Sequence, residues 1–151
     1  MSLRLAMPTT TFTIGQPIAV AIYLPAPAIT TTAGEQLGGY SLVLNFDPTV
    51  LRVVDVVWQE RNAHTLRLGP LLSAETGQLQ LGAHGVVPQT YPTEPLVTVH
   101  FAAHGEGNTA ITATRVEAVD GQGRTVAATV VPNNGQLTIQ SQQSFLPLVQ
   151  Q

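Results

Sequence analysis

The sequence predicts an all-β protein built from two packed sheets, and three observations lead to this fold class. Short segments rich in Val, Ile, Thr, Leu and Ala recur along the 151 residues, and each is bounded by Gly, Pro, Asn or Asp. No window shows a sustained helical period. About nine such segments separated by short turns are typical of a β-sandwich. The length suits one domain with a single core.

The expected strands follow one another along almost the whole chain. They are Leu3 to Met7, Pro17 to Leu24, Gly39 to Phe46, Arg52 to Trp58, Gln78 to His84, Leu96 to Ala103, Ala110 to Ala118, Arg124 to Val131 and Gly135 to Gln140. Turn residues at Gly105 to Asn108, Asp120 to Gly123 and Pro132 to Gly135 tolerate a positive φ and can close connections between strands. The proline-bearing segments Pro25 to Gln36 and Val87 to Pro95 lack strand patterning, so we expect surface loops there.

The third expected strand has the clearest alternation in the chain. Its apolar parity is Tyr40, Leu42, Leu44 and Phe46. Its other parity is Ser41, Val43 and Asn45. Successive side chains of a strand point to opposite faces, so this pattern predicts one buried face and one face open to solvent.

The strand should end at Asp47-Pro48. Proline has no N–H for the ladder, and the Asp47 side chain can accept a hydrogen bond from the backbone two residues on. We expect the chain to turn there and cross to the other sheet, with Val50 and Leu51 returning apolar side chains to the core. In the following RVVDVVW the inward parity is ambiguous, although Asp55 facing solvent would place Val54, Val56 and Trp58 inside.

Composition excludes several classes of function. The net charge of −3 provides no basic field for nucleic acid or an anionic membrane. There is no cysteine for a disulfide or thiolate site, and no apolar run approaches the ~20 residues of a membrane span. No basic segment precedes an apolar one at the start, so we expect no export signal within these residues and a fragment of a longer chain.

Two stretches of the sequence, GQPIAVAIYL and GGYSLVLNFDPTVLRVVDV, carry a family resemblance. They resemble the second strand and the Y-D-P signature of the cohesin domains, the receptor modules of cellulosome scaffolds, with Phe46 at the usual tyrosine. The likeness continues through GQLQLGA, PLVTVHFAAHG, TAITATRVEAVDGQG and NNGQLTI, in the family's order and spacing. It covers about Leu3 to Gln140, which we expect to be the sandwich domain, with residues 141–151 as a tail or linker.

The resemblance implies a nine-stranded, two-sheet β-sandwich with jelly-roll topology. It also implies a non-catalytic module that binds a small helical dockerin, with calcium on the partner's side and no cofactor of its own. The family's contact face is one sheet formed by its strands 8, 3, 6 and 5. Carried over, that face consists of Ser41, Val43, Asn45, Gln80, Gly82, Leu96, Thr98, His100, Thr125, Ala127 and Thr129. Ser41 replaces an aspartate common in the family, and the mapped face is mostly neutral.

Other chemistry has weaker support in the sequence. A metal hypothesis rests on His64, His84, His100 and His104, of which the resemblance implies that His84 and His100 lie on adjacent strands, but no carboxylate accompanies them, so we expect no metal site. The nine acidic residues are scattered, and no GxSxG, P-loop or HExxH motif occurs, so we expect no enzyme.

Two alternatives to a dockerin receptor stay open. The first is a carbohydrate-binding module, because related sandwiches bind polysaccharide through exposed aromatic residues, here Trp58 and Tyr91. The second is a structural spacer within a large protein. In all three interpretations the expected location is extracellular or at the cell surface, as part of a larger secreted protein.

Overall fold

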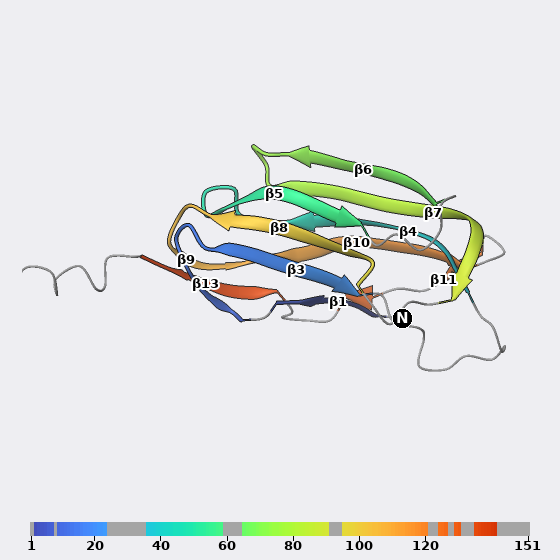
Figure 1. The fold of residues 1–151 in the computed structure, drawn as a ribbon, viewed down its shortest axis with the longest axis horizontal. Coiled ribbons are helices and arrows are strands. Elements are labelled where there is room, and N and C mark those ends of the chain that lie inside the picture. Colours follow the sequence, from blue (N-terminus) through green and yellow to red (C-terminus); the bar gives the residue numbers. More distant parts are fainter. Residues whose placement is uncertain are drawn as a thin grey trace, which may run out of the picture.

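The computed structural model describes residues 2–7, 9–23, 36–58, 65–90, 95–120, 124–126, 129–130 and 135–141. These residues contain strands and turns and no helix, so the predicted all-β class is confirmed (Figure 1). The strands are β1 (Ser2–Ala6), β2 (Thr11–Thr13), β3 (Pro17–Tyr23), β4 (Gln36–Asn45), β5 (Leu51–Trp58), β6 (Thr65–Ser73), β7 (Gln78–Thr90), β8 (Val97–Ala103), β9 (Gly107–Ala110), β10 (Thr112–Asp120), β11 (Thr125–Val126), β12 (Thr129–Val130) and β13 (Gln136–Gln140).

The strands form a jelly-roll sandwich of two main sheets. The front sheet has the order β12-β1-β3-β8-β5, and the back sheet has the order β11-β10-β4-β7-β6. Figure 1 shows β3, β8 and β5 lying in front of β4 and β10. A small third sheet, β2-β13-β9, continues the sandwich at the end where the chain leaves β13. All pairs are antiparallel except β1 with β12 and β2 with β13.

The core lies between the two sheets and is built from alternate residues of each strand. In β3 and β8 the alternation is regular, with every second side chain buried. On the back sheet Leu79 and Leu81 of β7 lie opposite Leu44 and Leu42 of β4 and are also buried. The rings of Phe46 and Phe101 meet edge to face, with centroids 5.4 Å apart, and so connect the end of β4 to the front sheet.

The Asp-Pro turn has the predicted structure. One carboxylate oxygen of Asp47 accepts hydrogen bonds from the Thr49 backbone N–H at 2.9 Å and from the Thr49 hydroxyl at 2.6 Å. These hydrogen bonds hold the pKa of Asp47 below its usual value. The backbone carbonyl of Asp47 also accepts from Leu51, whose partner in the front sheet is Ala103. The chain therefore crosses from the back sheet to the front sheet at this turn.

The expectation of nine strands is wrong in its count, because thirteen occur among the described residues. The most important omission is β6, where Gly69-Pro70 interrupts the apolar pattern and the structure has a register shift between Leu68 and Leu71. The short β2 was also not expected. The segments 110–118 and 124–131 each divide between two strands, and β11 and β12 lie in different sheets.

The second proline-bearing segment was expected as a loop from Val87, but β7 continues to Thr90. Pro88 is tolerated in the strand because it has no cross-strand partner on β4. The register with β4 passes directly from His84 to Gln89, across an irregularity. Gln36, expected as the last residue of the first loop, begins β4. The rest of that loop, residues 25–35, and residues 142–151 of the expected tail lie outside the described residues.

The expected inward parity of β5 is wrong at Val54, whose side chain is 57% exposed. A β-bulge between Val53 and Asp55 leaves Val54 without a partner on β8, so the alternation restarts there. Val56 and Trp58 pack against the core as expected. Among the described residues, no helix could span a membrane.

Candidate functional site

The candidate site is the outer side of the back sheet, and β4 lies at its centre. Leu42 and Leu44 of β4 are buried in the core, as predicted from the sequence. Ser41, Val43 and Asn45 point the other way and stay partly exposed. On the neighbouring strand β7, Gln78 and Gln80 point to the same side and are exposed.

The register of the back sheet arranges the outward side chains in rows that cross the strands. The middle row runs from Arg115 on β10 through Val43 and Gln80 to Leu71 on β6. A second row, on one side of it, holds Glu117, Ser41 and Gly82. The row on the other side is Thr112, Asn45, Gln78 and Ser73. We call the outward side of β10, β4, β7 and β6 the docking face.

The docking face is largely neutral, with its charge concentrated on one strand. Among its described outward residues, the charged ones are Arg115 and Glu117, two positions apart on β10, and both are exposed. The outward side chains on β4 and β7 are amides, a hydroxyl, a valine and the imidazole of His84. At the β6 edge Leu71 is 64% exposed, the highest value among the exposed large apolar side chains of the described residues. The face is therefore charged along β10 and apolar along β6.

A hydrogen bond fixes the geometry at one side of this face. The Asn45 side-chain amide donates to the hydroxyl of Thr114 at 2.6 Å, which links β4 to β10. Thr114 occupies a register shift in β10 between Ala113 and Arg115, so it reaches toward β4 without a ladder partner of its own. This contact orients the Asn45 side chain.

At the other side, the imidazole of His84 lies over Gly39. The two residues are cross-strand partners, and a Cβ added at Gly39 would meet the ring atoms Nδ1, Cγ and Cε1 of His84. Only glycine leaves room for the ring to lie flat on β4 in this position.

The structure brings together six of the eleven residues that the sequence placed on one sheet face. Ser41, Val43, Asn45, Gln80 and Gly82 occupy adjacent positions on β4 and β7. The sixth, Thr125, pairs on β11 with Val119 of β10.

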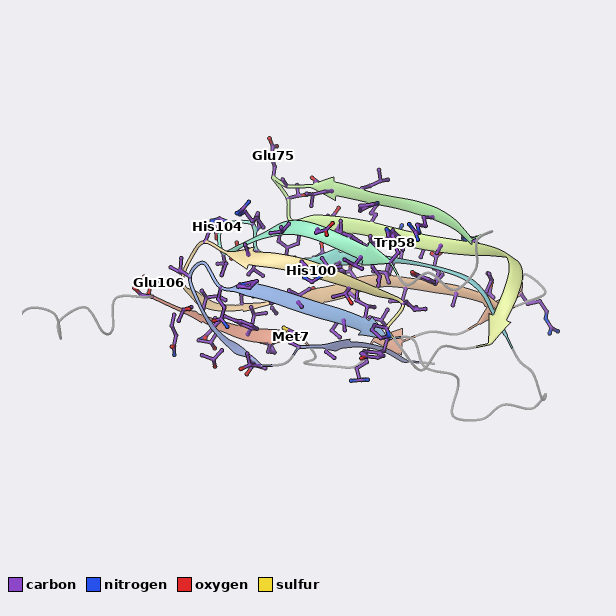
Figure 2. All side chains as sticks on the ribbon, in the orientation of Figure 1. Met7, Trp58, Glu75, His100, His104 and Glu106 are labelled. Carbon is purple, nitrogen blue, oxygen red and sulfur yellow. The ribbon has the colours of Figure 1, made fainter. Side chains whose placement is uncertain are left out.

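Leu96, Thr98 and His100 do not belong to this face. Thr98 and His100 lie on β8 in the front sheet, which Figure 2 shows for His100, and Leu96 directly precedes that strand. The expectation was wrong because β6 was not recognised. As a result, β7 and β8 were each counted one place too early in the strand order, and β8 was assigned to the wrong sheet. Thr129 lies on β12, also in the front sheet, and Ala127 lies outside the described residues.

Several residues of the docking face were missed by the sequence analysis. Gln78 and His84 share the parity of Gln80 and Gly82, so the alternation in GQLQLGAH could have indicated them. Arg115 and Glu117 required the correct strand to be paired with β4, and no local pattern supplies that pairing. Leu71 was missed together with β6.

The structure places the described histidines apart from one another. No group of three or more His, Asp or Glu side chains that could hold an ion occurs among the described residues. His84 and His100, expected on adjacent strands, lie in opposite sheets. His104 stands in the loop after β8, where its Nε2 is 2.9 Å from the carbonyl oxygen of Pro48 (Figure 2). His64 lies outside the described residues.

Of the two aromatic residues named for carbohydrate stacking, the structure describes Trp58, and Tyr23 and Tyr40 are two further aromatic residues that it describes. Trp58 packs against the core, and the Arg67 guanidinium lies 5.7 Å from the centre of its ring. The Arg4 guanidinium lies 4.3 Å from the centre of the Tyr23 ring. Tyr40 is buried, which raises the pKa of its phenol far above the usual range. Tyr91 lies outside the described residues.

Comparison with solved structures identifies the fold as that of cohesin modules. A type II cohesin from the cellulosome of Acetivibrio cellulolyticus superposes with a TM-score of 0.74 at 15% identity, covering 90% of this chain and 94% of the cohesin. A non-cellulosomal cohesin from the archaeon Archaeoglobus fulgidus gives 0.67 at 20% identity and covers 98% of both chains.

A third similar structure belongs to a type II cohesin–X–dockerin complex from Acetivibrio cellulolyticus. It gives a TM-score of 0.73 at 14% identity and covers 92% of this chain and 99% of that chain. At the level of sequence, no family model matches the chain, and no curated protein is similar to it. The predicted fold class and its likeness to cohesins are thus confirmed by the three-dimensional structure.

Proposed function

We propose that this protein is a non-catalytic binding module of the cohesin type, which captures a dockerin-like protein module on the docking face. The observation that carries the proposal is the alternation of β4: Leu42 and Leu44 hold the strand in the core, while Ser41, Val43 and Asn45 form the centre of an uncovered sheet surface. A flat, well-anchored surface of this kind suits recognition of another folded module.

The cohesin fold supports this function. The fold is one of non-catalytic binding modules, and two of the similar structures are cohesin–dockerin complexes, from Acetivibrio cellulolyticus and Clostridium thermocellum. The neutral centre of the docking face makes burial against a partner inexpensive, because few charges lose their hydration. The resemblance implies that the partner is helical and carries calcium, that this chain needs no cofactor, and that both act outside the cell or at its surface.

Capture with and without calcium tests the proposal. The immobilised protein is exposed to purified dockerin modules of type I and type II in calcium, and again in excess chelator. Binding in calcium and release in chelator is the expected result. Absence of binding by every module in calcium, with the protein shown to be folded, would refute the function.

A second experiment, retention on insoluble polysaccharide, separates the two alternatives. Retention of this protein on insoluble polysaccharide would favour a carbohydrate-binding module, although in the described part of the chain Trp58 and Tyr23 are covered by arginines. Binding neither to dockerin modules nor to polysaccharide would favour a spacer.

A further inference from the structure

The docking face also indicates how a partner helix lies on it, an inference that rests on the proposed function. We infer that one helix of the partner runs along β10 and β4, and that it carries an acidic and a basic residue one turn apart, which face Arg115 and Glu117. These two side chains are exposed and two residues apart on β10, pointing to the same side as Val43 and Ser41.

Both charges are free to receive a partner. Among the described residues, neither Arg115 nor Glu117 has an ion pair or hydrogen bond through its side chain, and they do not pair with each other. Other charged side chains do have contacts of their own: Arg4 and Arg67 lie against aromatic rings, and Asp47 accepts hydrogen bonds in its turn. The docking face thus carries one unmatched positive and one unmatched negative group at a fixed separation.

That separation matches a helix parallel to the strand. Residues i and i+2 of a strand are about 6.6 Å apart. Residues i and i+4 of a helix are about 6 Å apart along its axis and share one face. A helix aligned with β10 can therefore place a carboxylate at Arg115 and a cation at Glu117 together. A helix that crosses the strands would meet only one of the two at close range.

The width of a helix agrees with this placement. Neighbouring strands lie about 4.8 Å apart, and a helix with its side chains is about 10 Å wide, so one helix covers β10 and β4 together. Beside the two charges it would rest on Val43 and Ser41 of β4, which are the cross-strand partners of Arg115 and Glu117. The charges then fix the position of the helix along the strand, while the neutral centre provides the contact area.

Charge reversal on β10 tests the inference. Arg115→Glu, Glu117→Arg and the double variant are titrated calorimetrically with a calcium-loaded dockerin module that binds the wild type, at low and high salt. Arg52→Glu and Asp55→Arg, both on β5 of the front sheet, are the matched controls, because both residues are exposed and lie in the sheet opposite the docking face.

Each single reversal should raise Kd about tenfold at low salt and less at high salt, with the controls unchanged. Exchanging the acidic and basic residues of one helix of the dockerin module should restore binding to the double variant. A Kd within twofold of wild type for both single variants would overturn the inference and leave the proposed function standing. An effect at only one of the two positions would overturn the placement along β10. If no dockerin module binds the wild type, the function fails, and this inference fails with it.

Discussion

The side-chain amide of Asn45 and the hydroxyl of Thr114 are joined by a 2.6 Å hydrogen bond across the outer side of the back sheet. Thr114 is available for this contact because it occupies the irregularity in β10. The bond holds Asn45 at one side of the docking face, two positions from Val43. The Asn45 side chain therefore enters binding already oriented, which lowers the entropy cost of ordering it on association.

The most direct consequence concerns Val43. Val43→Asp should abolish dockerin capture, because the new carboxylate would be desolvated beneath the partner without a cation of its own. The fold should persist, since the side chain points away from the core. Thr98→Asp, the matched change on the outer side of the front sheet, should leave capture unchanged. Calorimetry on both variants measures the difference, and equal affinities would exclude the docking face.

Substitutions at Leu44 and Leu71 should have different effects, the first on the stability of the fold and the second on binding of the partner. Leu44 is fully buried, so Leu44→Ala should lower the free energy of unfolding by about 2 to 5 kcal/mol. Leu71 is largely exposed, so Leu71→Ala should change stability by no more than about 0.5 kcal/mol and weaken the partner's binding by about 1 kcal/mol. Denaturant unfolding and calorimetry give the two quantities. A large loss of stability at Leu71 would mean that β6 packs differently.

Gly39 and His84 should behave as a coupled pair. Gly39→Ala places a methyl group against the His84 ring, which should cost about 1 to 3 kcal/mol of stability through overpacking. In the background of His84→Ala the same change should cost much less, because the obstructing ring is gone. A double-mutant cycle by denaturant unfolding measures this coupling. Additive effects would show that the ring does not lie over Gly39.

Asp47 gives a prediction about acid stability. The pKa of Asp47 is lowered in the folded protein, so its carboxylate contributes fully to the stability of the fold above the unfolded-state pKa of about 3.9. This contribution is lost as the pH falls through the lower pKa of the folded state. Asp47→Ala should therefore lower the melting temperature at pH 7, and the difference from wild type should shrink below about pH 4. Thermal unfolding at a series of pH values tests this, and a constant difference across the series would contradict it.

Features that depend only on residues close together in the chain could be predicted from the sequence. The alternation of β4 and the turn at Asp47-Pro48 were predicted correctly, because period-two patterning and proline's missing N–H act locally. The inward parity of β5 was not, because a bulge at Val54 inserts one residue into the strand, and valines on both sides of Asp55 give no sign of where the alternation shifts.

The composition of the docking face depends on long-range pairing, which local patterns do not contain. One unrecognised strand, β6, was enough to transfer Thr98 and His100 to the wrong sheet, because each later strand was then matched to its neighbour's place. The same omission hid Arg115 and Glu117, since their side of β10 is defined only by pairing with β4. The prediction of the fold class was still correct without β6, whereas the prediction of the site residues was not.

The central claim is that a dockerin-like module binds the outer side of the back sheet. The most direct test is an amide chemical-shift titration of the ¹⁵N-labelled protein with a calcium-loaded dockerin module. The account predicts that the perturbed amides concentrate on β10, β4, β7 and β6, with those of β3 and β8 unchanged. Perturbations confined to β3 and β8, or none at saturating dockerin, would contradict it.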